Sequence, residues 1–286
     1  MILELLSDLE TKKVILDTLH QNFLHNLQIS LQLGTELEFY LSENISLDQL
    51  SIFLKPLLNK ENIVFEKEKG NNQYELKLPI MTDPCVLAKK LTYIKSTMLE
   101  LLAIHNIDII FLAKPYPDQI GSSLHIHLSL WKEEKNLLEK DHEVESDTML
   151  NAIGGMCALM LESMIFFAPT ENCYKRFTRN HEAPTTVSWG GNNRTTALRI
   201  PSSPPGKRRI EHRVSSSASD PYLALTAILI SVFYGIKNKI LAPKRIYGNA
   251  SDNQYQLKQL PKNLLESLNL FENSIIIKPW IYKLIN

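Results

Sequence analysis

Two histidines alternate with apolar residues in segment 121–130, which reads Gly-Ser-Ser-Leu-His-Ile-His-Leu-Ser-Leu. Strict alternation of apolar and polar residues predicts a half-buried β-strand. His125, His127 and Ser129 share the polar face of that strand. Because imidazole is the usual metal ligand and acid–base group in proteins, we expect ligands or catalysts on this face. Taken alone, the pattern leaves a structural role for either histidine open.

Carboxylates follow the same two-residue period in other predicted strands. If these strands form one curved sheet, the acids line its concave face and repel one another unless cations neutralise them. Carboxylates with a single imidazole favour hard divalent ions, Mg²⁺ or Mn²⁺, over a thiolate zinc site. For Glu36 and Glu38 alone, a solvent-facing sheet edge is the alternative. The acids are Glu36 and Glu38 in strand 34–41, Glu68 and Glu75 on a strand pair over 62–68 and 73–78, and Glu211 in strand 209–213.

The second half of the chain supplies arginines, whose planar guanidinium groups hold phosphate and carboxylate oxygens in pairs. Two cations with an arginine clamp are the equipment of phosphoryl transfer. A solvated basic patch is the alternative, and a nucleic-acid surface is disfavoured because Glu211 interrupts the basic run and no aromatic platform accompanies it. No Walker loop or Gly-x-Gly-x-x-Gly turn is present. The arginines are Arg176, Arg194, Arg199, Arg209 and Arg213.

The elements that position these residues alternate between helix and strand patterns. Apolar residues at helical spacing predict helices over 9–27, 84–105, 148–167 and 221–237, and Pro261 is expected to start a final short helix. An apolar strand is expected over 107–112, and the polar stretch 132–146 is expected to be a hairpin or loop. The paired glycines Gly154 and Gly155 indicate close helix packing.

Composition narrows the class of protein. The 286 residues have zero formal net charge, so no general attraction to nucleic acid or membrane is expected. Three widely separated cysteines indicate free thiols in a reducing compartment. No signal-peptide pattern opens the chain, and the most apolar run, 224–234, is too short to cross a bilayer. We therefore expect a cytoplasmic protein of enzyme size.

Taken together, these segments resemble the glutamine synthetase superfamily of ATP-dependent carboxylate–amine ligases over residues 30–240. The resemblance implies an α+β fold for residues 1–286, as a single catalytic domain whose curved antiparallel sheet forms a half-barrel flanked by helices. The matching segments are the acidic strands around Glu36 and Glu75, Lys114-Pro115 with 121–130, 172–177 with 182–184, Trp189-Gly190, Asn193-Arg194, Arg199-Ile200-Pro201 and 209–213.

The resemblance also implies roles for individual residues. One cation would be held by Glu38, Glu68 and Glu75, and a second by Glu36, His125 and Glu211. Glutamate would be bound by Arg176, Arg213 and Gly121. Glu182, on a flap, and Arg194, at the phosphates, would act in catalysis, and His127, Ser129, Arg199 and Arg209 would hold ATP.

The implied reaction joins glutamate to ammonia or an organic amine through a γ-glutamyl phosphate, with Mg²⁺ or Mn²⁺ as cofactor and a homo-oligomer or a homologue as partner. The alternative is a non-catalytic or regulatory relative that binds nucleotide or a full-length homologue. Ile120 stands where glutamine synthetases proper have Asn, and Asp220 where Asn is usual. The Gly-Ser-x-x-His context resembles the γ-glutamylpolyamine synthetase branch, which favours an organic amine.

Two further departures concern the ends of the chain. The family's N-terminal β-grasp domain, which lends an Asp to a neighbouring subunit's site, is not found before Glu36, and the C-terminal helices look shortened. We therefore expect this chain alone to bind Mg²⁺–ATP, to form amide slowly while hydrolysing ATP, and not to build the family's stacked rings.

Overall fold

The computed structural model describes residues 2–140, 142, 144–178 and 183–285. Its strands are β1 (Ser30–Leu41), β2 (Val64–Lys67), β3 (Gln73–Met81), β4 (Ile109–Ile110), β5 (Leu124–Lys132), β6 (Lys135–Asn136), β7 (Trp189–Gly190), β8 (Leu198–Arg199) and β9 (Ile210–His212). Its α-helices are α1 (Ile2–Leu5), α2 (Leu9–Asn22), α3 (Leu47–Phe53), α4 (Lys55–Leu58), α5 (Pro84–Ala103), α6 (Asp147–Leu159), α7 (Met164–Phe167), α8 (Glu171–Tyr174), α9 (Pro221–Lys237), α10 (Leu264–Glu272) and α11 (Ile277–Ile285). A π-helical turn, Phe23–Leu27, extends α2, and a 3₁₀ turn covers Asn253–Tyr255.

One sheet collects the strands of the described residues, in the order β2-β3-β1-β5-β9-β8-β7, with β4 beside β1 and β6 beside β5. Every pair is antiparallel except β7 with β8. The fold is therefore α+β with a mostly antiparallel sheet, which confirms the prediction from sequence.

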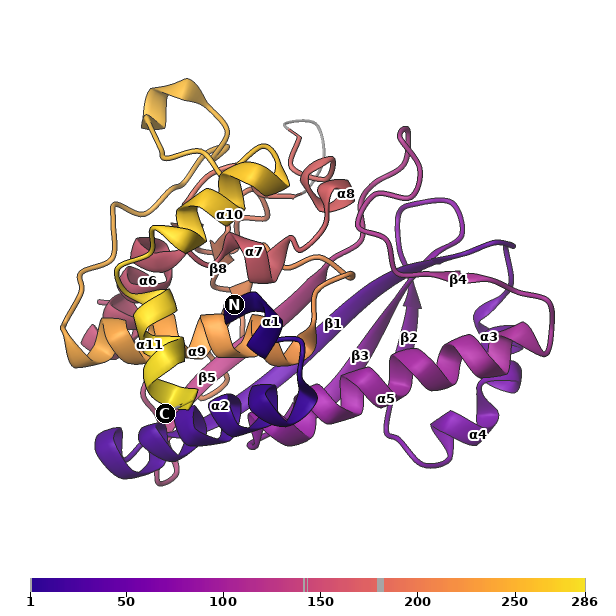
Figure 1. Ribbon diagram of the computed structural model, residues 1–286, viewed down its shortest axis with the longest axis horizontal. Coiled ribbons are helices and arrows are strands. Elements are labelled where there is room, and N and C mark those ends of the chain that lie inside the picture. Colours follow the sequence, from indigo (N-terminus) through magenta and orange to yellow (C-terminus); the bar gives the residue numbers. More distant parts are fainter. Residues whose placement is uncertain (1, 141, 143, 179–182, 286) are drawn as a thin grey trace.

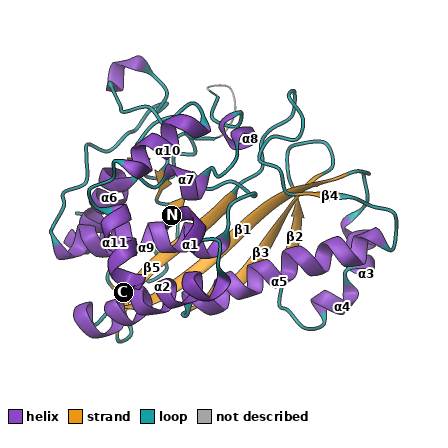
Figure 2. Cartoon of the chain, viewed as in Figure 1, coloured by secondary structure: helices purple, strands orange, loops and turns teal. Residues whose placement is uncertain are grey.

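The two faces of the sheet differ as the alternation predicts. On β1, Leu31, Leu33 and Leu37 are buried in the core, whereas Glu36 and Glu38 point to the opposite face and stay partly exposed. The core side is covered by helices: α5 contacts β3, β4 and α9, and α9 contacts α2 and α6. Figure 1 shows the long α5 beside β1–β3, and α6, α9, α10 and α11 together at the opposite end of the molecule. Figure 2 shows the strands as one twisted sheet with helices along one side.

Local sequence explains where the main helices begin and how they pack. Asp83 and Asp220 cap α5 and α9 by accepting hydrogen bonds from backbone N–H groups of the first turn, and a proline follows each cap. Gly155 of α6 lies so close to α9 that an added Cβ would stand 2.1 Å from the Ser231 carbonyl oxygen. Close helix packing thus explains this glycine. Of the described helices, none is long and apolar enough to span a membrane.

Three of the expected elements differ from the structure. The helix expected over 148–167 breaks after Leu159, where buried Ser163 donates its hydroxyl hydrogen to the Leu159 carbonyl. Only Ile109–Ile110 of the strand expected over 107–112 pairs with β1. The helix expected at Pro261 starts at Leu264 instead, because Asn263 accepts a hydrogen bond from Glu266 N and caps it, and a second helix, α11, follows.

Candidate active site

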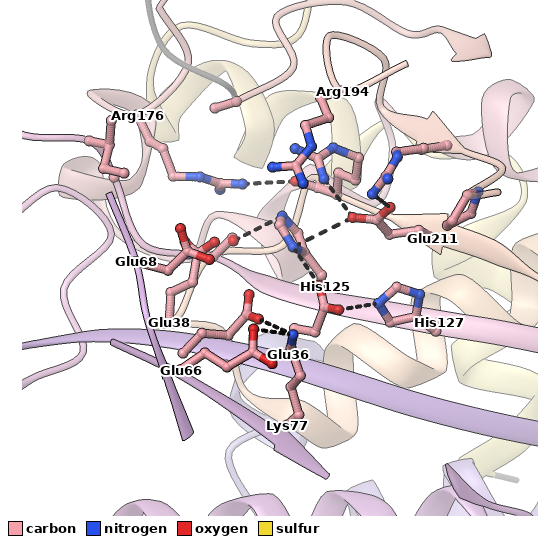
Figure 3. Close-up of a pocket in the computed structure, with 18 of the residues that line it drawn as sticks. Glu36, Glu38, Glu66, Glu68, Lys77, His125, His127, Arg176, Arg194 and Glu211 are labelled. Atoms are coloured by element: carbon pink, nitrogen blue, oxygen red, sulfur yellow. Dashed lines mark hydrogen bonds and ion pairs between the residues drawn. The ribbon is translucent and has the colours of Figure 1, made fainter. Parts of the chain in front are cut away.

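Strand register brings the acids and histidines of the polar face together. Glu38 pairs with Glu75 across β1 and β3, and Glu36 pairs with His125 across β1 and β5. Their side chains enter a cavity of about 310 Å³, in which His125 lies between carboxylates on one side and arginines on the other (Figure 3). The charged residues of its wall are Glu36, Glu38, Glu66, Glu68, Glu75 and Glu211, with Lys77, Arg176, Arg194, Arg199, Arg209 and Arg213.

Within this cavity two groups of side chains have the composition and spacing of a cation site. One is Glu36, His125 and Glu211, and the other is Glu38, Glu75 and His125; the ligand atoms of each group lie within 4.8 Å of one another. The first group is the set that the resemblance implies for one ion. In the second group His125 takes the place expected for Glu68, which lines the same cavity.

The carboxylates around the second group repel one another. Burial of Glu75, together with repulsion by Glu36 and Glu38, raises the pKa of its carboxyl to about 8. Burial and the charge of Glu38 also raise the pKa of Glu68. A divalent ion would relieve this repulsion, so the donor set and its electrostatics fit Mg²⁺ or Mn²⁺.

The two histidines stabilise the ionised form of Glu36. Burial disfavours ionisation of this carboxyl, but the imidazoles of His125 and His127 lie 3.4 and 3.3 Å from its oxygens and together lower its pKa. Ser123 holds His125 from the other side, with its Oγ 2.9 Å from Nε2, and donates its backbone N–H to Glu38 Oε2 at 2.7 Å. The strand that carries the histidines therefore also orients the acids opposite them.

Glu211 joins the histidine strand to the arginines. It is fully buried, and its two oxygens accept hydrogen bonds from Arg199 Nη1 at 2.7 Å and Arg213 Nη1 at 2.5 Å. Burial opposes its ionisation, yet His125 and Arg213 in particular lower the pKa of its carboxyl to about 2. In this arrangement the guanidinium groups expected to bind phosphate and glutamate instead hold a carboxylate.

Arg176 also has a structural contact that the sequence does not reveal. It is 3% exposed, and its two terminal nitrogens donate to the backbone carbonyls of Val214 and Arg213 at 2.9 and 2.8 Å. Burial lowers the pKa of its guanidinium to about 10. Gly121 lies against it, where an added Cβ would stand 2.4 Å from Arg176 Cγ. Both residues line the cavity. Because Arg176 donates to the backbone of Arg213, it fixes the chain at the arginine-rich end of the cavity.

A second hollow, a groove of about 270 Å³, adjoins the acidic cavity. Its wall combines apolar side chains, including Ile80 and Trp131, with Ser129 and Lys207. Ser129 accepts a hydrogen bond from Trp131 Nε1 at 2.9 Å, which fixes the indole ring. The residues that line both hollows are Glu36, Lys77, His127 and Arg209.

Comparison with known families identifies the family of this chain. The model of the glutamine synthetase catalytic domain matches residues 53–284. The chain belongs to the glutamine synthetase family. Glu36 and Glu38 precede the matched range, so their assignment to the site depends on the pairing of β1 with β3 and β5.

Similar proteins include family members with different acceptors in their names. The chain is 36% identical to γ-glutamylputrescine synthetase PuuA of Escherichia coli over 151 residues, 52% of this chain and 32% of that protein. It is 36% identical to type-1 glutamine synthetase 2 of Dictyostelium discoideum (75% of this chain, 42% of that protein). It is 32% identical to glutamate–isopropylamine ligase of a Pseudomonas species (72% and 46%). The chain thus spans a third to a half of the length of these three relatives.

Solved structures of GmaS share the fold. The structure of GmaS with ADP in conformation 1 superposes with a TM-score of 0.83 at 23% identity, covering 96% of this chain and 70% of that one. Apo GmaS gives a TM-score of 0.83 at 25% identity, covering 94% and 69%. The glutamine synthetase catalytic fold predicted from sequence is confirmed.

The residues expected at a glutamine synthetase site divide between the two hollows. Ser129 lies in the groove, and Glu182 lies outside the described residues. Three expected residues line both hollows: Glu36, His127 and Arg209. The other expected residues all line the acidic cavity. Sequence reasoning missed Glu66, Lys77, Ser123 and Trp131. The two-residue period offered a signal for Lys77, which shares a strand face with Glu75.

Proposed function

We propose that this chain is an ATP-dependent ligase that joins the side-chain carboxylate of glutamate to an amine through γ-glutamyl phosphate. The observation that carries the proposal is one cavity that contains two potential cation clusters and five arginines. A partly apolar groove adjoins this cavity and shares four lining residues with it. Phosphoryl transfer requires this equipment, because catalysis depends on positioning and on neutralising charge. Family membership supports the choice of glutamate and ATP as substrates.

Cation binding falls to the two clusters described above. Glu36, His125 and Glu211 would hold one Mg²⁺ or Mn²⁺ and Glu38 with Glu75 another, with Glu68 within the same cavity. When bound, such ions neutralise phosphate oxygens and the crowded carboxylates. Binding at Glu211 would compete with the contacts of Arg199 and Arg213 and so free guanidinium donors for the substrates.

The two hollows suit different parts of the substrates. The groove, with Trp131 and Ile80, would take the nucleoside, and His127, Ser129 and Arg209 would contact the nucleotide. The γ-phosphate would enter the acidic cavity near Arg194 and Arg199. Glutamate would lie at the end formed by Gly121, Arg176 and Arg213.

The reaction then needs two displacements. In the first, an oxygen of the glutamate side chain attacks the γ-phosphorus, the bond to the bridging oxygen breaks, and ADP leaves. In the second, the amine nitrogen attacks the acyl carbon, phosphate leaves with the carboxylate oxygen, and the nitrogen loses a proton. The arginines hold the phosphate oxygens in both steps, and Glu182, which lies outside the described residues, remains a proposed catalytic residue.

An organic amine is the proposed acceptor. Ile120 places an apolar side chain in the cavity wall beside Gly121. An apolar contact gains free energy from an alkyl chain and offers no hydrogen bond to ammonia. Relatives named for putrescine and isopropylamine are consistent with this choice.

The proposal is tested by measuring ADP release with glutamate and a panel of amines: ammonia, ethanolamine, alkylamines and polyamines. We expect release that requires glutamate and both Mg²⁺ and ATP, and that is lost in Glu75→Ala but kept in the exposed control Glu43→Ala. No ADP with any amine, together with co-purification of a full-length homologue, would favour the non-catalytic alternative.

A further inference from the structure

Lys77 is a resident cation inside the acidic cavity. It lies on β3 opposite Glu36, and its Nζ is 2.6 Å from Glu66 Oε2 and 3.2 Å from Glu75 Oε1. Its side chain is 34% exposed, so solvent and other groups can reach the ammonium group. Lys77 therefore occupies one carboxylate of a group, Glu38–Glu75–His125, that has the spacing of a cation site.

Lys77 also lies where the acidic cavity and the groove share lining residues. Lys77 lines both the acidic cavity and the groove, as do Glu36, His127 and Arg209. Arg209 is held by its own contacts, donating from Nε to His127 Nδ1 at 3.1 Å and from Nη1 to Ser203 Oγ at 3.0 Å. A polyanion that extends from the groove into the cavity would lie beside the residues that line both, and Lys77 and Arg209 are the cations among them. Lys77 is a flexible ammonium on a four-carbon stem, which can change partners by rotation.

We propose that Lys77 exchanges partners during nucleotide binding: it competes with the divalent cation for Glu75 in the free protein and contacts the polyphosphate when nucleotide binds. The inference rests on the proposed function for its second half. A divalent ion at Glu75 repels the ammonium group, because both are positively charged and would share one carboxylate. The released ammonium then lies at the passage between the hollows, where phosphate oxygens pass. Lys77 thus contacts phosphate in the proposed reaction, and it weakens cation binding in the protein without ATP.

The experiment compares the wild-type chain with Lys77→Met, which keeps the length and removes the charge, and with Lys77→Arg. The control Lys67→Met removes an equal charge from the neighbouring strand, where Lys67 Nζ contacts Asn44 outside the cavity. Electron paramagnetic resonance of free Mn²⁺ gives the cation affinity. Calorimetry with a non-hydrolysable ATP analogue at saturating Mn²⁺ gives the nucleotide affinity.

Opposite changes are expected in the two measurements. In Lys77→Met, Mn²⁺ should bind roughly threefold to tenfold more tightly because its competitor is gone, while the ATP analogue should bind about tenfold more weakly because a charge-assisted contact is lost. Lys77→Arg should restore nucleotide binding, and Lys67→Met should change neither affinity.

Three results would overturn the inference. Mn²⁺ affinity that is unchanged or weaker in Lys77→Met would show that Lys77 does not compete with the ion. Unchanged analogue affinity would remove the phosphate contact. Parallel loss of both affinities would indicate a structural role only. If the wild-type chain binds Mn²⁺ but not the ATP analogue, both the proposed function and the phosphate contact of Lys77 are wrong. The Mn²⁺ affinities of wild type and Lys77→Met would still show whether Lys77 competes with the ion for Glu75.

Discussion

Replacing Glu75 by Gln should stabilise the protein without divalent cations and abolish cation binding to its cluster. Glu75 is 5% exposed, and burial with repulsion from Glu36 and Glu38 raises the pKa of its carboxyl to about 8. Because the folded state binds this proton more tightly than the unfolded chain, stability falls as pH rises from the ordinary value of 4.5 to about 8. Gln is nearly isosteric and carries no charge at any pH, so it removes this penalty.

The magnitude follows from the same two values. A rise from 4.5 to about 8 corresponds to at most about 5 kcal/mol of destabilisation above pH 8. At pH 5.5 roughly 1.4 kcal/mol of this destabilisation is already present, and the rest develops as the pH rises. The stability advantage of Glu75→Gln over the wild type should therefore grow by up to ~3 kcal/mol between pH 5.5 and 8.5. Solvent and Lys77 reduce this figure by screening.

The assay is urea unfolding, followed by tryptophan fluorescence, at both pH values with a chelator present. Glu66→Gln is the matched control, since Glu66 is the other partner of Lys77 but its side chain is 52% exposed. It should change the free energy of unfolding by less than about 1 kcal/mol with no trend in pH. An advantage of Glu75→Gln that does not grow with pH would refute the charge-crowding argument. So would an advantage that persists in saturating Mn²⁺, because the ion should stabilise only the wild-type cluster.

Three further predictions concern other parts of the site. Glu211→Ala should lower the free energy of unfolding by about 3 kcal/mol or more, because it leaves the guanidinium groups of Arg199 and Arg213 without their carboxylate; an unchanged melting temperature would contradict this. In Gly121→Ala the new Cβ would displace Arg176, so we expect KM for glutamate to rise at least about tenfold while Mn²⁺ affinity stays the same; equal loss of both would show a general defect. Trp131→Ala should weaken the ATP analogue about tenfold in calorimetry with no change in glutamate binding, and unaltered affinity would place the nucleoside elsewhere.

The faces of the strands could be predicted from sequence, but their neighbours could not. The two-residue period assigns Glu36, Glu38 and His125 to polar faces because successive side chains in a strand point to opposite sides. Which residues meet depends on register, a long-range property set by the whole sheet. The resemblance had grouped Glu38 with Glu75, but their direct pairing across β1 and β3, and the place of His125 in both clusters, emerged only from the structure.

Contacts made by polar side chains were the least predictable. Lys77 shares a strand face with Glu75, but the same pattern fits an ordinary solvent-facing lysine, and its two carboxylate partners are what place it in the site. Arg176 could be expected in the site, but not its donation to two backbone carbonyls. The helix break between Leu159 and Met164, where the Ser163 hydroxyl donates to the Leu159 carbonyl, is not visible in the periodic apolar pattern.

The most direct test of the proposed ligase follows oxygen from glutamate to phosphate. The chain is incubated with Mg²⁺, ATP, an acceptor amine and glutamate labelled with ¹⁸O in its side-chain carboxylate, and the inorganic phosphate is examined by mass spectrometry. Since the attacking oxygen stays on phosphorus when the amine attacks the acyl carbon, one ¹⁸O should appear in phosphate for each amide formed. Phosphate without label, released at the same rate when glutamate is omitted, would contradict the acyl-phosphate mechanism and the ligase assignment.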